Sequence, residues 1–314
     1  MKMDAKGSLV TINIDGKPLE KLIDVVSKGI GTLYRPRKIR NEADARAYAI
    51  KVLENAKAMA SSETMLIEAE TVERIGQRMV AQEIRRQNNI DSVVEKAAED
   101  LKGKQVSDEP VDDDWAARFF NIVQDVSKDE MKVLWAKILA KEIEKPLSYS
   151  IRTLEILRNI SFKEAELFKR LADYVLIQNG GFVFYENDIL QKHGIYYIDE
   201  CKLREADLLQ SGEMVSRTYK SSQNGVNIHN IIYGNWFIQI TLPSQTQNVQ
   251  MNIILLTQAG VEIFELMDIN PKMDYLKEIA TFIKKKNPAA IVQYSRIIER
   301  RNEKVRYELP LMEL

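Results

Sequence analysis

The chain has 314 residues, of which 45% are hydrophobic and 29% charged, a balance typical of soluble globular proteins. This length predicts about two domains and a full hydrophobic core, which excludes general disorder. The 45 Lys and Arg residues oppose 46 Asp and Glu residues, so the formal charge is -1. A protein coated in basic charge for nucleic acid is therefore excluded, whereas a local basic patch is not.

The sequence argues against a membrane-spanning helix and against a disulfide. No apolar run reaches the roughly 18 residues that a membrane-spanning helix needs, and the first residues lack the apolar stretch of a signal peptide. A single cysteine, Cys201, excludes an internal disulfide and a multi-cysteine zinc module. We expect a cytoplasmic protein, with peripheral contact to the inner membrane as an alternative.

Residues 1–40 form a basic N-terminal segment, in which nine Lys and Arg residues oppose four acidic residues. The alternation in Val10-Thr11-Ile12-Asn13-Ile14 predicts a short strand. Pro18 suits the first position of a helix. An amphipathic helix is predicted from one apolar stripe, made by Leu19, Leu22, Ile23, Val26, Ile30 and Leu33.

Residues 41–102 predict a long alanine-rich helical region, because they contain no proline and one glycine. A continuous helix would reach roughly 90 Å at about 1.5 Å per residue. We therefore expect either breaks, at Ser61-Ser62 or Asn88-Asn89, or a projecting helix that seeks a partner. Strict heptads are not sustained, so a coiled coil is one option among these.

Residues 103–113 read as an acidic linker, and residues 114–178 as a helical block. Pro110 interrupts any helix in the linker. Within the block, Ser127 with Glu130 and Ser161 with Glu164 have capping-box spacing. The second box opens a helix whose apolar residues are Leu167, Phe168, Leu171 and Val175.

Residues 179–314 change character and predict an α+β region with a C-terminal hairpin. The predicted strands are 182–185, 226–233, 236–242, 249–256, 290–298 and 305–311. The predicted helices lie near 187–193 and 199–210, and begin near 257 and at Pro271. From 162 to 268 the order is helix, strand, two helices, strands and helix, which is the order of a winged helix with an enlarged wing. The fold class is therefore mainly α with a smaller α+β part: a long N-terminal helix or helices, a central helical block and a winged-helix-like C-terminal region.

Catalytic signatures are missing from the sequence. It has no phosphate-binding Gly-rich loop, no dinucleotide fingerprint, no nucleophile elbow and no His-Glu-x-x-His. His193, His229 and Cys201 are interpreted as structural residues. The acidic residues Asp108, Glu109, Asp112, Asp113 and Asp114 could serve a hard cation, but they also suit a helix N-terminus. We predict no catalytic residue, no cofactor and no metal site.

Two basic clusters are the candidate contacts for phosphates of nucleic acid or of anionic lipid. They comprise Arg35, Arg37, Lys38 and Arg40, and Lys284, Lys285 and Lys286. The alternative is that the first cluster pairs with the acidic linker or stays solvated, and that the second is the usual cationic end of a helix.

The central block resembles a family of bacterial proteins catalogued as a domain of unknown function. The resemblance rests on Val111 to Phe120, Val126-Ser127, Leu134 to Ala140 and Ser150 to Leu157, with upstream support from Gly29 to Arg37 and Arg85 to Ile90. The same helices are similar to the abortive-infection alpha family, although Lys145-Pro146-Leu147-Ser148 stands where a His-Pro pair is usual. That second likeness implies a role in bacterial defence against phage.

Together these observations predict a non-enzymatic phage-defence or interaction protein that acts through self-assembly into a homo-oligomer and through a protein partner from phage or host. A nucleic-acid-binding protein and a peripheral membrane protein are the alternatives, both through the basic clusters. Trigger, partner and effector step do not follow from the sequence.

Overall fold

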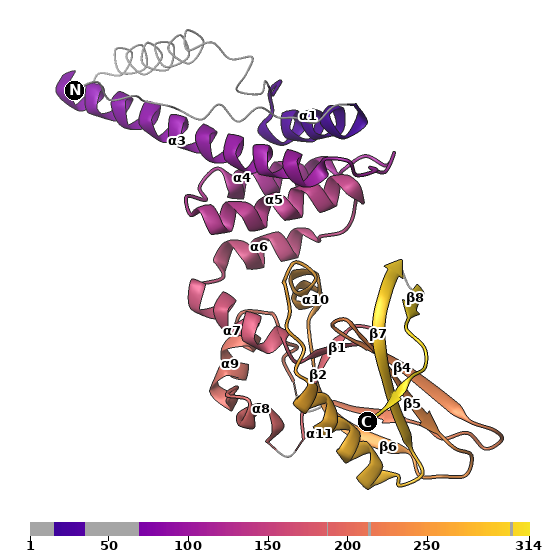
Figure 1. Ribbon diagram of the computed structural model, residues 1–314. Coiled ribbons are helices and arrows are strands. Elements are labelled where there is room, and N and C mark those ends of the chain that lie inside the picture. The colour runs from indigo at the N-terminus through magenta and orange to yellow at the C-terminus, as the bar shows by residue number, and fades with distance from the viewer. Residues whose placement is uncertain (1–15, 35–68, 187, 213–214, 302–303) are drawn as a thin grey trace, which may run out of the picture. The chain divides into compact units, whose positions relative to one another are not determined.

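The computed structural model describes residues 16–34, 69–186, 188–212, 215–301 and 304–314 (Figure 1). The chain divides into two compact units, residues 1–154 and 155–314. The strand predicted at 10–14, the alanine-rich part of the helical region before residue 69 and the cluster from Arg35 to Arg40 lie outside the described residues.

The first unit is helical in its described residues. Its helices are α1 (Lys17–Ile30), α3 (Ala69–Leu101), α4 (Asp113–Val123) and α5 (Asp129–Glu144), and α6 (Ile151–Asn159) spans the boundary between the units. Helix α3 packs mainly on α5, and α1 packs mainly on α4. Helix α3 is continuous through Asn88-Asn89, so the break predicted there is wrong.

Aromatic side chains of α4 and α5 build the centre of this unit. The rings of Trp115 and Phe119 stack with centroids 5.1 Å apart, and Trp135 meets Phe119 edge-on at 5.5 Å. All three side chains are buried. The Trp115 indole N–H donates to the carbonyl of Tyr149 at 2.9 Å, so the buried polar atom of this ring is satisfied.

A glycine permits the close approach of α1 and α4. A β-carbon at Gly29 would lie 2.8 Å from the carbonyl oxygen of Ala116 and would overlap the ring of Phe120. These contacts indicate that the missing side chain of Gly29 is what lets the two helices touch.

Side-chain caps fix several helix starts. Asp112 accepts from the N–H of Trp115 at 2.8 Å, which supports the structural interpretation of this carboxylate. The Ser161–Glu164 capping box is present in both directions, as predicted. The box predicted at Ser127 is wrong, because α5 begins at Asp129 with Lys128 as its N-cap, and Glu130 then falls one position short of where a box needs it.

The second unit combines an antiparallel sheet with helices. Its helices are α7 (Phe162–Ala172), α8 (Ile189–Lys192), α9 (Tyr197–Glu205), α10 (Gln258–Phe264) and α11 (Met273–Lys286). Its strands are β1 (Val175–Ile177), β2 (Gly181–Phe184), β3 (Val215–Tyr219), β4 (Asn227–Tyr233), β5 (Trp236–Leu242), β6 (Val249–Leu255), β7 (Ile291–Arg301), β8 (Lys304–Tyr307) and β9 (Met312–Glu313).

The sheet order is β3-β6-β2-β1-β4-β5-β7-β8, with β9 also paired to β7, and neighbouring described strands pair antiparallel throughout. Helix α11 packs on β6 and β7. Its Tyr275 hydroxyl accepts from the N–H of Phe184 at 2.8 Å, which ties the helix to β2 inside the core. The predicted mainly helical chain with an α+β C-terminal part is confirmed at this level.

Three strands differ from the sequence expectation, and one of them is β9, which lies beyond the strand predicted at 305–311. Val175, placed at the end of a helix by its apolar spacing, begins β1, because the chain turns at Asn179-Gly180 and pairs Val175 with Val183. Strand β3 was not predicted at all. It pairs with β6, more than thirty residues further along the chain, so its local sequence carries little of the signal.

Candidate interaction surface

The apolar stripe of α3 continues beyond the part of the helix that is packed. In the C-terminal half, the stripe is buried and consists of Ile90, Val93, Val94, Ala97, Ala98 and Leu101. Ile75 lies eighteen positions before the buried Val93, and Met79 lies eighteen positions before the buried Ala97. Eighteen residues are about five turns at 3.6 residues per turn. Ile75 and Met79 therefore share the face of the stripe, yet 38% and 44% of their surface is exposed.

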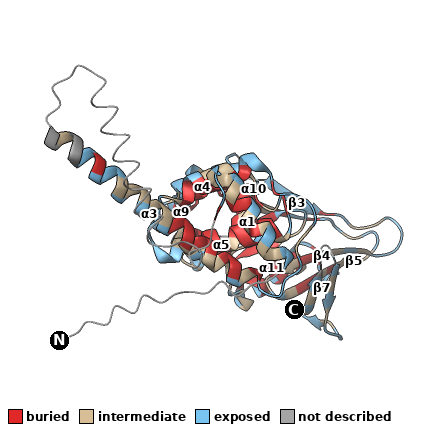
Figure 2. Cartoon of the chain, turned by 90° about the horizontal axis from the view of Figure 1, so that it is seen from above, coloured by how far each residue is buried: buried red, intermediate tan, exposed pale blue. Residues whose placement is uncertain are grey.

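The exposed half of α3 extends past the helices that cover the other half. Figures 1 and 2 show its N-terminal turns running beyond α4 and α5, with buried residues concentrated towards the C-terminal end. Ile84 is also exposed, at 52%, but it lies two and a half turns before Val93 and so faces the opposite side of the helix. Helix geometry therefore separates Ile84 from Ile75 and Met79.

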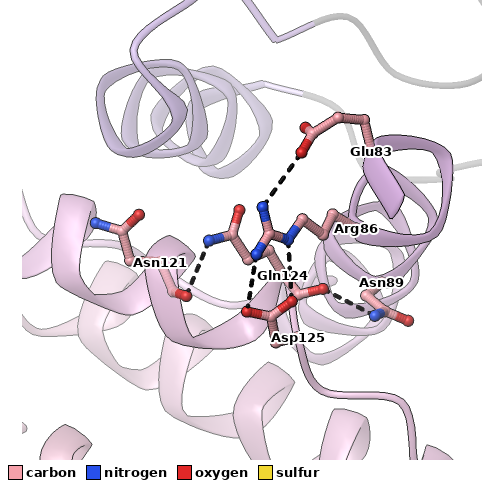
Figure 3. Close-up of polar contacts among 6 residues, drawn as sticks. All are labelled: Glu83, Arg86, Asn89, Asn121, Gln124 and Asp125. Atoms are coloured by element: carbon pink, nitrogen blue, oxygen red, sulfur yellow. Dashed lines mark hydrogen bonds and ion pairs between the residues drawn. The ribbon is translucent and has the colours of Figure 1, made fainter. Parts of the chain in front are cut away.

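Polar contacts mark the place where packing ends (Figure 3). Arg86 Nε donates to Asp125 Oδ1 at 3.0 Å, and a guanidinium nitrogen of Arg86 lies 3.2 Å from Glu83 Oε1. The hydrogen bond to Asp125 is the largest of the effects that raise the pKa of Arg86. Asn89, which is buried, donates to the carbonyl of Gln124 at 2.9 Å. These contacts anchor α3 to the end of α4 and fix the direction in which its exposed half leaves.

A basic edge flanks the exposed stripe. Arg74, Arg78 and Arg85 are exposed and follow one another at spacings of four and seven residues, so they share one side of the helix. Glu83, half-exposed, lies on the other side of the stripe. The surface thus combines apolar side chains with charges of opposite sign on its two edges, which is the pattern of a helix that pairs with another helix.

The predicted basic cluster at the end of α11 is only partly open to solvent. Lys284 Nζ lies 3.0 Å from Glu313 Oε1, so this cation contacts β9. Lys286 lies over the ring of Phe282 at 5.4 Å, and Lys285 and Lys286 are exposed. The other cluster, Arg35, Arg37, Lys38 and Arg40, lies outside the described residues. Anion contact through either cluster stays a prediction.

The two histidines and the cysteine lie in the second unit, and Nε2 of His193 is a buried atom without a hydrogen-bond partner among the described residues. His193 ends α8 with Nε2 3.5 Å from Glu278 Oε1, and its ring lies beside Tyr174. His229 Nε2 lies 3.1 Å from the carbonyl oxygen of Lys220. Cys201 is half-buried in α9. Within the described ranges, no three His, Cys, Asp or Glu side chains are grouped to hold a metal ion.

Residues 73–182 match a family described as "Protein of unknown function (DUF2806)". The match runs from the exposed half of α3 through α7 to the start of β2. It supports the predicted resemblance to a domain of unknown function for this part of the chain. A search of curated proteins found no match, and neither did a search of solved structures. None of the described helices combines the length and apolar character needed to cross a bilayer.

Proposed function

We propose that this chain is a non-enzymatic interaction protein that self-associates through the exposed stripe of α3. The observation that carries the proposal is the continuation of a core stripe, as Ile75 and Met79, onto turns that no described helix covers. An apolar face that repeats the spacing of a packed face is suited to bury itself against a second helix. The second helix is the same stripe of another copy.

The charged edges support a parallel pair. If Ile75 and Met79 occupy d and a positions, Arg78 falls at g, Glu83 at the following e, and Ile84 at the outward f position. In parallel two-stranded coiled coils a g residue meets the e residue five positions on in the partner helix. Arg78 of each copy would then face Glu83 of the other, on both sides of the stripe.

The size of the stripe sets the strength of the association. Complete burial of a Leu- or Met-sized side chain contributes about 1.5–3 kcal/mol, and less than half of each of these surfaces is exposed. Four such side chains in a pair of copies give about 2–5 kcal/mol, and because association also loses translational and rotational freedom, the stripe alone supports an affinity of about millimolar or weaker. We therefore expect an equilibrium that shifts with protein concentration, not a permanent dimer.

Matched substitutions on opposite faces of α3 test the proposal. Ile75→Glu places a charge on the stripe, and Ile84→Glu makes the same change on the outward face. Sedimentation velocity of the full chain over a concentration series should show association for wild type and Ile84→Glu, and its loss for Ile75→Glu. A monomer at every concentration for wild type, or equal behaviour of the two variants, contradicts the proposal.

A charge exchange tests the parallel geometry. Arg78→Glu alone and Glu83→Arg alone each bring like charges together and should weaken self-association. An equimolar mixture of the two variants restores both opposite-charge contacts and should form a mixed pair. If the mixture behaves as the separate variants do, the parallel arrangement is wrong even where self-association stands.

A role in defence against phage extends this proposal. Its support is the likeness of residues 111–165 to the abortive-infection alpha family, and the winged-helix-like order of elements from 162 to 268, which also suits protein binding. Bacteria that express wild type, Ile75→Glu or Ile84→Glu should be challenged with a phage panel at low and high dose. Protection at low dose that only Ile75→Glu abolishes is the expected result. Protection that Ile75→Glu retains would separate defence from self-association.

A further inference from the structure

A cavity of about 210 Å³ lies within the second unit, between residues 185–186, residues 188–191, helix α9 and strand β6. Its lining consists of Tyr185, Glu186, Asp188, Ile189, Leu190, Gln191, Glu200 and Asn252. The lining contains three carboxylates and no lysine, arginine or histidine. Its volume is below the roughly 300–1,000 Å³ of pockets that hold drug-sized molecules, so the space suits a small ligand.

One of these carboxylates is deeply buried without a direct ion pair. Glu200 is 3% exposed, and within the described ranges it forms no salt bridge. Arg204, one turn further along α9, directs its guanidinium to the carbonyl oxygen of Gln210 instead. Arg204 attracts the charge of Glu200 and the hydroxyl of Tyr185 hydrogen-bonds to it, but together these lower the pKa of Glu200 less than burial raises it. A buried carboxylate in this state is costly unless it is protonated or meets a positive group.

The other polar groups around the cavity are held in place. Glu186 Oε1 accepts from the N–H of Asn252 at 2.9 Å, and the N–H of Tyr185 donates to the carbonyl of Asn252 at 2.9 Å. Tyr185 and Glu186 are therefore both held to Asn252 of β6. Tyr197 on α9 is 66% exposed and close enough to Glu200 and Tyr185 to interact with them electrostatically. Aromatic rings beside carboxylates are the surroundings that alkylammonium groups prefer.

We propose that this cavity binds a small organic cation, with its ammonium group at Glu200 and its alkyl part against Ile189 and Leu190. An ammonium donates up to three hydrogen bonds, so it can satisfy Glu200 together with a second lining oxygen. The lining offers too few ligands for a bare metal ion, because within the described ranges no three His, Cys, Asp or Glu side chains converge. Binding of the cation replaces the proton that the buried carboxyl otherwise holds.

The probe is n-butylammonium, titrated into the full chain by isothermal titration calorimetry, with 1-butanol as its neutral counterpart. Glu200→Gln removes the charge with little change of shape, and Glu205→Gln removes an exposed charge from the same helix. Butylammonium should bind saturably to wild type and Glu205→Gln, and about tenfold or more weaker to Glu200→Gln. 1-Butanol should show no saturable binding to any of the three chains.

A second measurement on wild type alone guards against a folding defect in the variant. Near neutral pH, the cation should displace a proton from Glu200 to the buffer. The measured binding enthalpy should therefore change with the ionisation enthalpy of the buffer. Absence of saturable butylammonium binding, equal binding of butanol, equal affinity of the two variants, or binding without proton release each overturns the proposal. The cavity and the α3 stripe belong to different units, so this result is independent of the self-association test.

Discussion

Replacement of Glu200 by glutamine should stabilise the second unit at alkaline pH. Burial raises the pKa of Glu200 from the usual 4.5 to about 7, and this exceeds the opposing effects of Arg204 and of the Tyr185 hydrogen bond. Because the pKa is higher in the folded chain, folding takes up a proton between these values, and stability falls as pH rises from about 4.5 to about 7. At about 1.36 kcal/mol per pKa unit, the loss is about 3 kcal/mol and is complete above pH 7.

The amide of Glu200→Gln stays neutral at every pH, so the variant should not suffer this loss. It should unfold like wild type near pH 4 and be more stable by about 3 kcal/mol near pH 8. The chain contains three tryptophans, and Trp236 lies in the second unit while Trp115 and Trp135 lie in the first. Urea unfolding of chain labelled with fluorotryptophan, followed by fluorine NMR, reads the two units separately.

The tryptophans of the first unit serve as an internal control for this measurement. The resonances of Trp115 and Trp135 should unfold at the same urea concentration in wild type and variant, because Glu200 belongs to the other unit. Glu205→Gln, on the exposed side of α9, should leave the Trp236 transition unchanged. A Glu200→Gln chain that is less stable than wild type at pH 8, or that keeps the pH dependence of wild type, would refute the burial argument.

Two further substitutions probe the helical packing and the caps. Gly29→Ala should destabilise the first unit by about 1–3 kcal/mol, because the new methyl group meets Phe120 and the carbonyl of Ala116; an unchanged urea midpoint of the Trp115 signal would contradict it. Ser161→Ala should destabilise α7 by about 1 kcal/mol, because the Ser161 side chain no longer accepts from the N–H of Glu164. Amide hydrogen exchange in the first turn of α7 should then be faster than in wild type. Unchanged exchange would mean that packing alone holds this turn.

Much of the fold follows from local sequence signals. Capping at Asp112 and Ser161, apolar periodicity along α4, α5 and α11, and alternation along β4, β5 and β6 place these elements within a few residues of their observed bounds. The missed strands have a common cause. Strands β1 and β3 are short, and their pairing partners decide them, so their own residues carry a weak signal.

The candidate sites were less accessible to sequence reasoning. Ile75, Met79 and Ile84 all count as apolar in a sequence window, and the packing of Val93 and Ala97 is needed to show which of them continue the core face. The cavity is harder still, because Tyr185, Glu200 and Asn252 come from segments far apart in the sequence. On its own, Glu200 reads as one more charge on a short helix.

Arg86 explains why the stripe of α3 stops being a core surface where it does. It stands fourteen residues after Val72 and seven after Met79, at a position where the stripe would otherwise carry an apolar side chain. A guanidinium there cannot be buried on α5 without a partner, and Asp125 at the end of α4 provides one at the solvent boundary. The apolar residues that follow towards the N-terminus repeat the spacing of a buried face with no described helix of the unit against them. Single exposed apolar residues are common on protein surfaces, so it is the shared spacing of Ile75 and Met79 with the buried face, and not their exposure alone, that motivates the proposed self-association.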